Sequence, residues 1–69
     1  MTETDFNKLG WYRNPKVAAD EYTHKKGHSM KRSSEGRITF YKVKNNRVEL
    51  FKLRSTRFDQ AIKEIAREI

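Results

Sequence analysis

The chain has 69 residues, a length that fits one domain with a small hydrophobic core, so residues 1–69 are expected to form a single domain. It contains no cysteine and no apolar run long enough for a transmembrane helix or a secretory signal, which excludes a disulfide framework and predicts a soluble cytoplasmic protein. Sixteen Lys and Arg against nine Asp and Glu give a formal charge of +7, which favours nucleic acid as the partner. A solvated basic surface is the alternative interpretation of this charge.

The N-terminal segment contains one aromatic cluster. Residues 1–7 are polar and acidic apart from Phe6, and we predict that they form a frayed terminus. Trp11 and Tyr12 follow a glycine, and this aromatic cluster indicates that residues 9–13 pack on the hairpin predicted below for residues 37–53. They would do so either as a third strand or as a plug. Core packing is the expected role of this cluster, and contact with a protein partner is the alternative.

A proline marks the expected start of a short helix. Asn14 and Pro15 have the form of an N-cap followed by proline at the first helical position. The sequence therefore predicts a helix over residues 15–22.

Residues 23–36 are basic and almost without apolar side chains, Met30 being the exception. Such a segment cannot offset its ordering entropy by burial, so we predict a flexible basic loop. Its charge makes it a candidate arm for binding phosphates, and a plain solvated linker is the alternative. The cations of this candidate arm are Lys25, Lys26, Lys31 and Arg32.

His24 and His28 are four residues apart, a spacing that pairs of metal ligands use on a helix. The sequence near them has no cysteine or carboxylate cluster to complete four ligands, and Gly27 between them disfavours a helix. We therefore expect two loop histidines, no metal site and no cofactor.

Two strand-like segments joined by a turn organise the C-terminal half. Residues 37–43 and 48–53 are rich in β-branched and aromatic side chains, and they flank Asn45 and Asn46, which tolerate the positive φ of a two-residue turn. The sequence therefore predicts an antiparallel hairpin over residues 37–53. Because side chains alternate between faces, one face should carry the apolar residues Ile38, Phe40, Phe51 and Leu53.

A helix is predicted over residues 57–69, with Ser55 and Thr56 offering hydroxyl groups for its N-cap. Apolar residues recur at the spacing of one helix face, and they are Phe58, Ala61, Ile62, Ile65, Ala66 and Ile69. This face should pack on the apolar side of the hairpin. The expected fold class is α+β, a small antiparallel sheet packed on a C-terminal helix.

The second face of the hairpin should carry an apolar patch near the turn and polar or basic residues toward the open end. The apolar residues are Tyr41, Val43, Val48 and Leu50, and the others are Arg37, Thr39, Lys52 and Arg54. Exposed apolar patches usually mark interaction sites, so this patch is either a docking surface or covered by the N-terminal segment. We expect partial cover by Trp11, Tyr12 and the short helix.

Catalysis is not expected. The chain has no glycine-rich phosphate loop, no cysteine nucleophile, and no histidine with an orienting carboxylate at a recognisable spacing. A small sheet with one helix also offers little concavity for a substrate. The sequence therefore favours a binding module, with neither a membrane nor a small molecule as its partner.

The run GRITFYKVKNNRVELFKLRSTRFDQAIKEI, from Gly36 to Ile65, resembles the β-sheet DNA-binding domains at the N-termini of tyrosine-type integrases and their AP2-like relatives in plants. In that family one helix backs a three-stranded sheet, so the resemblance implies a third strand from residues 9–13. It also implies a small basic module that binds duplex DNA in transcription or other DNA transactions. The residues that would face DNA are Arg37, Thr39, Tyr41, Lys52 and Arg54.

A protein-binding regulator is the second functional class. A small, basic domain without cysteine and with aromatic clusters is similar in style to compact bacteriophage proteins that dock on host RNA polymerase in the host cytoplasm and inhibit or redirect it. Aromatic and apolar anchors, more than charges, would then supply the affinity. The candidate anchors are Trp11, Tyr12, Tyr41, Val43, Val48 and Leu50.

Overall fold

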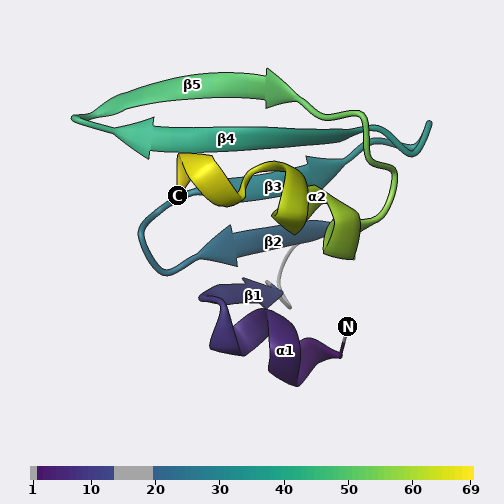
Figure 1. Ribbon diagram of the computed structural model, residues 1–69. Coiled ribbons are helices and arrows are strands. Elements are labelled where there is room, and N and C mark those ends of the chain that lie inside the picture. Colours follow the sequence, from purple (N-terminus) through teal and green to yellow (C-terminus); the bar gives the residue numbers. More distant parts are fainter. Residues whose placement is uncertain (1, 14–19) are drawn as a thin grey trace.

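The protein is built on one antiparallel sheet, seen in a computed structural model that describes residues 2–13 and 20–69. Its elements are α1 (Glu3–Lys8), β1 (Trp11–Arg13), β2 (Glu21–His24), β3 (Ser29–Arg32), β4 (Ile38–Lys44), β5 (Arg47–Lys52), α2 (Phe58–Glu64) and the 3-10 helix η1 (Ala66–Glu68). The five strands lie in sequence order, α1 lies at the β1 edge, and α2 crosses one face (Figure 1). The predicted α+β class and the third strand near residues 9–13 are confirmed. Neither α1 nor α2 has the length and apolar character needed to cross a bilayer.

The predicted hairpin is present with the predicted turn. Asn45 and Asn46 have φ of 52° and 62°, as a two-residue turn that follows the sheet twist requires. Val43 pairs with Val48 and Phe40 with Phe51, which is the expected register. The C-terminal helix also forms, but it ends at Glu64 and continues as η1.

The N-cap of α2 differs from the prediction. Arg57 is the N-cap residue, and its side chain makes no capping bond but pairs with Asp59 at 3.0 Å. The hydroxyl of Ser55 donates instead to the Glu64 carboxylate at 2.8 Å. The β5–α2 connection is therefore tied to the far end of the helix and not to its first turn.

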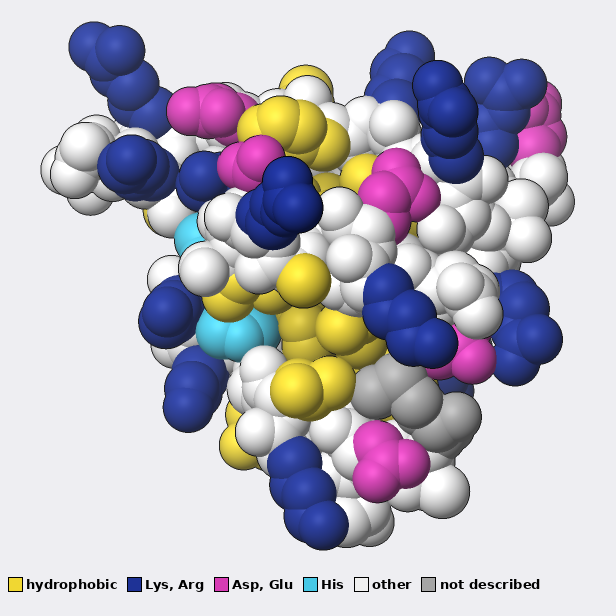
Figure 2. All heavy atoms as spheres, viewed as in Figure 1, with side chains coloured by type: hydrophobic (Ala, Val, Ile, Leu, Met, Phe, Trp, Pro, Cys, Tyr) yellow, Lys and Arg dark blue, Asp and Glu magenta, His cyan; other side chains and the backbone are white. Residues whose placement is uncertain are grey.

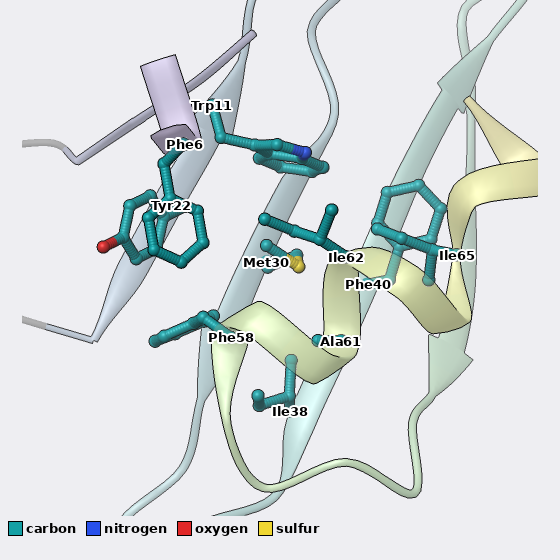
Figure 3. Packing of buried hydrophobic residues seen from close by; sticks show 10 residues of the cluster. All are labelled: Phe6, Trp11, Tyr22, Met30, Ile38, Phe40, Phe58, Ala61, Ile62 and Ile65. Atoms are coloured by element: carbon teal, nitrogen blue, oxygen red, sulfur yellow. The ribbon is translucent and has the colours of Figure 1, made fainter. Parts of the chain in front are cut away.

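The hydrophobic core lies between the sheet and α2 (Figure 3). The expected packing of α2 on the Ile38 and Phe40 face is confirmed, with Phe51 and Leu53 at the edge of the cluster. Burying a large apolar side chain contributes about 1.5–3 kcal/mol, so this layer is the main source of stability. The buried residues are Phe6, Trp11, Tyr22, Met30, Ile38, Phe40, Phe58, Ala61, Ile62 and Ile65.

The prediction of a flexible basic loop over residues 23–36 is wrong for residues 23–24 and 29–32, which lie in β2 and β3. Tyr22 and Met30 face each other across these strands, and both are buried against α2. Of the two histidines predicted in a loop, His28 does lie in the connection between β2 and β3, whereas His24 is the last residue of β2. Both are buried, and an apolar residue at position 24 would have revealed the strand alternation. The turn between the strands carries Lys25 and Lys26.

The prediction of a frayed N-terminus is also wrong, since Glu3 to Lys8 form α1. The Thr2 hydroxyl accepts from the Asp5 amide at 3.3 Å and the Asp5 carboxylate accepts from the Thr2 amide at 3.0 Å, a reciprocal capping box. Phe6 anchors the helix by stacking on Tyr22 with 4.6 Å between ring centroids. The predicted helix over 15–22 is wrong at Tyr22, which lies in β2, and residues 14–19 lie outside the described part of the chain.

Candidate nucleic-acid interface

One face of the sheet carries α2, and no element in the described part of the chain packs on the other. We call this second side the open face. The expected cover by the N-terminal segment is wrong for the described residues, because β1 extends the sheet edge and Trp11 points to the helix side, 6.3 Å from Phe40 between ring centroids. One row of directly paired residues crosses the open face. Its members are Tyr12, Thr23, Ser29, Tyr41 and Leu50.

A groove of about 650 Å³ lies at the end of the open face where β4 begins and β5 ends. Five cations and one carboxylate line it, together with Thr39 and Tyr41. The cations are Lys31, Arg32, Arg37, Lys52 and Arg54, and the carboxylate is Glu35. A concave surface with this excess of one sign concentrates anions from solution. The strand pairing explains the cluster, since Lys31 is opposite Thr39 and Thr39 is opposite Lys52.

Three of these cations form no direct ion pair in the described part of the chain, although the pKa of Glu64, which a hydrogen bond from Ser55 lowers most, is also lowered by the charge of Arg54. Arg37, Lys52 and Arg54 take part in no ion pair among the residues that the structure describes. The Lys31 ammonium lies 3.8 Å from the Glu21 carboxylate and 5.3 Å from the centroid of the Tyr41 ring. On the opposite side of the molecule, by contrast, acidic side chains lie among the basic ones (Figure 2).

Arg32 has a mainly structural role. Its guanidinium donates to the Asp20 carboxylate at 2.8 Å and lies 5.1 Å from the centroid of the Phe58 ring. It also donates to the backbone carbonyl of Thr56 at 3.4 Å. This side chain therefore ties β3 to the start of α2, and it reaches the groove only from its edge.

The backbone on both rims of the groove is held in place. The Glu64 carboxylate accepts hydrogen bonds from the amides of Arg54 and Ser55, at 3.1 and 3.2 Å. These bonds, with that from the Ser55 hydroxyl first among them, lower the pKa of Glu64. On the other rim, the Ser33 hydroxyl accepts from the Arg37 amide at 3.3 Å. The two arginine side chains thus extend from fixed backbone positions.

The structure brings six of the eight predicted nucleic-acid residues to this groove, namely Lys31, Arg32, Arg37, Thr39, Lys52 and Arg54. Lys25 and Lys26 lie in the β2–β3 turn, at the other end of the strands, where Lys26 adjoins Lys42 and Arg67. The prediction of one basic loop placed Lys25 and Lys26 together with Lys31 and Arg32, because it did not recognise the two strands that separate them.

The predicted protein-binding residues fall into two groups, one buried and the other on the open face. Trp11 is fully buried, so its assignment as an exposed anchor is wrong. Tyr12 is 50% exposed, Val48 59% and Leu50 64%, and all three lie on the open face with Tyr41 and Val43. An apolar strip therefore borders the basic groove along the β4–β5 hairpin.

The two buried histidines are held by the backbone. The Nδ1 of His24 accepts from the Lys26 amide at 3.1 Å, and its Nε2 lies 3.1 Å from the carbonyl of Leu9, to which it can donate. The Nδ1 of His28 accepts from the Val43 amide at 2.9 Å. Both rings are thus placed as neutral imidazoles, and burial lowers the pKa of each below its ordinary value of 6.5.

This burial predicts an acid-sensitive fold. Because the folded pKa values lie below the unfolded ones, the unfolded chain binds more protons as the pH falls through about 6.5, and stability decreases. We expect the free energy of unfolding in urea to fall from about pH 7 to about pH 5, before most carboxylates titrate. A His28→Asn variant keeps an acceptor for the Val43 amide and should show a shallower pH dependence. Equal slopes for both proteins would contradict the assignment.

The chain matches no protein-family model, and neither curated proteins nor solved structures include a detectable relative. The resemblance to integrase and AP2-like domains therefore stays a prediction. Function must therefore be inferred from the residues of the open face.

Proposed function

We propose that this protein binds nucleic acid through the open face of its sheet. The observation that carries the proposal is the groove, in which five cations and one carboxylate meet, with Arg37, Lys52 and Arg54 unpaired among the described residues. Phosphate groups supply the complementary charge, and neutralising them releases counterions from the nucleic acid. Thr39 adds a hydroxyl that can donate to phosphate oxygens.

A salt titration tests this proposal. With Lys31, Arg37, Lys52 and Arg54 each on one phosphate, the logarithm of the association constant should fall against the logarithm of salt concentration with a slope of about −3 to −4. Replacing Lys52 by alanine should make the slope shallower by roughly 0.7 to 0.9. Fluorescence anisotropy with a labelled oligonucleotide measures both quantities.

The matched control is Lys63→Ala, which removes the same charge from an exposed site on α2. Its affinity and salt slope should equal those of the unaltered protein. If Lys63→Ala and Lys52→Ala weaken binding equally, the interaction is diffuse attraction to a charged protein and the groove is not the site.

A protein-binding regulator, such as a phage protein that docks on host RNA polymerase, is the second proposal. The apolar strip on the hairpin favours it, because Val48 and Leu50 are more than half exposed beside Val43. A complex held by this strip would survive moderate salt, whereas a complex held by phosphates would not. The oligonucleotide titration, beside a pull-down from cell lysate at two of the same salt concentrations, therefore separates the two proposals.

A further inference from the structure

The open face is too broad to enter a duplex groove. Five strands at about 4.8 Å spacing span roughly 19 Å, whereas the major groove is about 12 Å wide and admits a two-stranded ribbon. The tip of the β4–β5 hairpin is narrow enough, but it lies at the opposite end of these strands from Arg37 and Arg54. The groove cations and the part of the sheet that could enter a duplex are therefore separated.

The same face has the composition of a stacking surface. Tyr12 and Tyr41 lie in one row, three strand spacings or roughly 14 Å apart, with the small side chains of Thr23 and Ser29 between them. Single-stranded nucleic acid binds to such surfaces because exposed aromatic rings stack on its unpaired bases. Tyr12 is 50% exposed, whereas Tyr41 is partly exposed and carries the Lys31 ammonium over its ring, 5.3 Å from the centroid. A base that stacks on this side of Tyr41 therefore displaces the ammonium toward the phosphates.

We infer that the open face binds a single strand of nucleic acid, with bases on Tyr41 and Tyr12 and phosphates at the groove cations. This inference rests on the proposed function and names its ligand class. A flexible strand can follow the concave groove and lay its bases across the adjoining row, whereas a duplex presents only phosphates to a flat sheet. DNA and RNA strands share this chemistry.

The test compares three labelled ligands of one mixed sequence about 15 units long: single-stranded DNA, single-stranded RNA and duplex DNA. At a fixed moderate salt concentration, anisotropy should show at least about tenfold tighter binding of one or both single strands than of the duplex. The ratio between the DNA and RNA arms identifies the natural sugar. Binding to the duplex as tight as to both strands would overturn the inference and leave the proposed function standing.

Two variants of Tyr41 separate stacking from charge. Tyr41→Leu keeps an apolar side chain but removes the ring, and it should weaken single-strand binding by about fivefold or more without changing the salt slope. Tyr41→Phe keeps the ring and should retain the affinity. Circular dichroism and thermal melting establish that both are folded.

Each remaining outcome has a distinct meaning. Unaltered single-strand affinity in Tyr41→Leu would overturn the stacking role of this residue. An absence of salt-dependent binding to all three ligands would instead overturn the proposed function itself. The inference would be supported if the salt slope becomes shallower by about 0.7 in Lys52→Ala and Tyr41→Leu loses affinity.

Discussion

In a Phe40→Ala variant, most molecules are expected to be unfolded. Phe40 is fully buried at the centre of the sheet, where its ring lies 6.3 Å from that of Trp11 and 5.8 Å from that of Phe51, between centroids. Removing a buried phenylalanine costs about 3–5 kcal/mol, which is comparable to the whole stability of a domain this small. Urea denaturation and the dispersion of amide NMR signals measure the loss.

Leu50→Ala is the matched control for this change. Leu50 lies on the adjacent strand but is 64% exposed on the open face, so its removal should change the free energy of unfolding by no more than about 0.5 kcal/mol. A folded Phe40→Ala protein with native-like dispersion would mean that the sheet faces are assigned the wrong way round. A large loss in Leu50→Ala would point to the same conclusion.

The hairpin and the last helix were predictable because their patterns are local and uninterrupted. Apolar residues alternate with polar ones at the open end of the hairpin, where Ile38 and Phe40 are buried and Phe51 is partly buried, and two asparagines supply the turn. The register of the pairing then places Thr39 opposite Lys52, which is why the shared face of Arg37, Thr39, Lys52 and Arg54 could be inferred without a structure.

Strands β2 and β3 were missed because their inward positions are not all apolar. The inward residue His24 of β2 and the neighbouring His28, in the connection to β3, are polar side chains whose burial is made possible by hydrogen bonds to the backbone. A hydropathy pattern therefore takes both for surface residues. Lys31 alternates with Met30 and reaches the open face, but that assignment needs the strand to be recognised first. The one sequence signal for β2 is short: Tyr22 and His24, which are buried, alternate with the exposed Thr23.

The sequence also could not show which face of the sheet Trp11 occupies, because this depends on contacts with residues distant in the chain. Trp11 and Tyr12 are adjacent in β1, so they must point to opposite sides of the sheet, and their sequence does not say which one is buried. The edge-on contact of Trp11 with His24, 4.8 Å between centroids, decides it. Tyr12 is thereby left exposed on the open face.

Gly10→Ala is expected to destabilise the protein more than a glycine substitution in a turn normally does. Gly10 has φ of +91°, and a Cβ at this position would lie 2.6 Å from the Nε2 of His24. That nitrogen is within hydrogen-bond distance of the Leu9 carbonyl at 3.1 Å, so moving the ring breaks the bond and disturbs its contact with Trp11. Thermal unfolding measures the effect.

The control is Gly36→Ala, because Gly36 has a similar φ of +86° but a Cβ there would meet no atom within 4 Å. Both variants carry the cost of a left-handed residue, about 1–2 kcal/mol, and only Gly10→Ala adds an overlap worth roughly 1–3 kcal/mol more. In a His24→Ala background the extra cost should disappear, since the ring that the methyl group would meet is absent. If Gly10→Ala stays more damaging than Gly36→Ala in that background, the extra cost comes from the backbone around Gly10 and not from the imidazole.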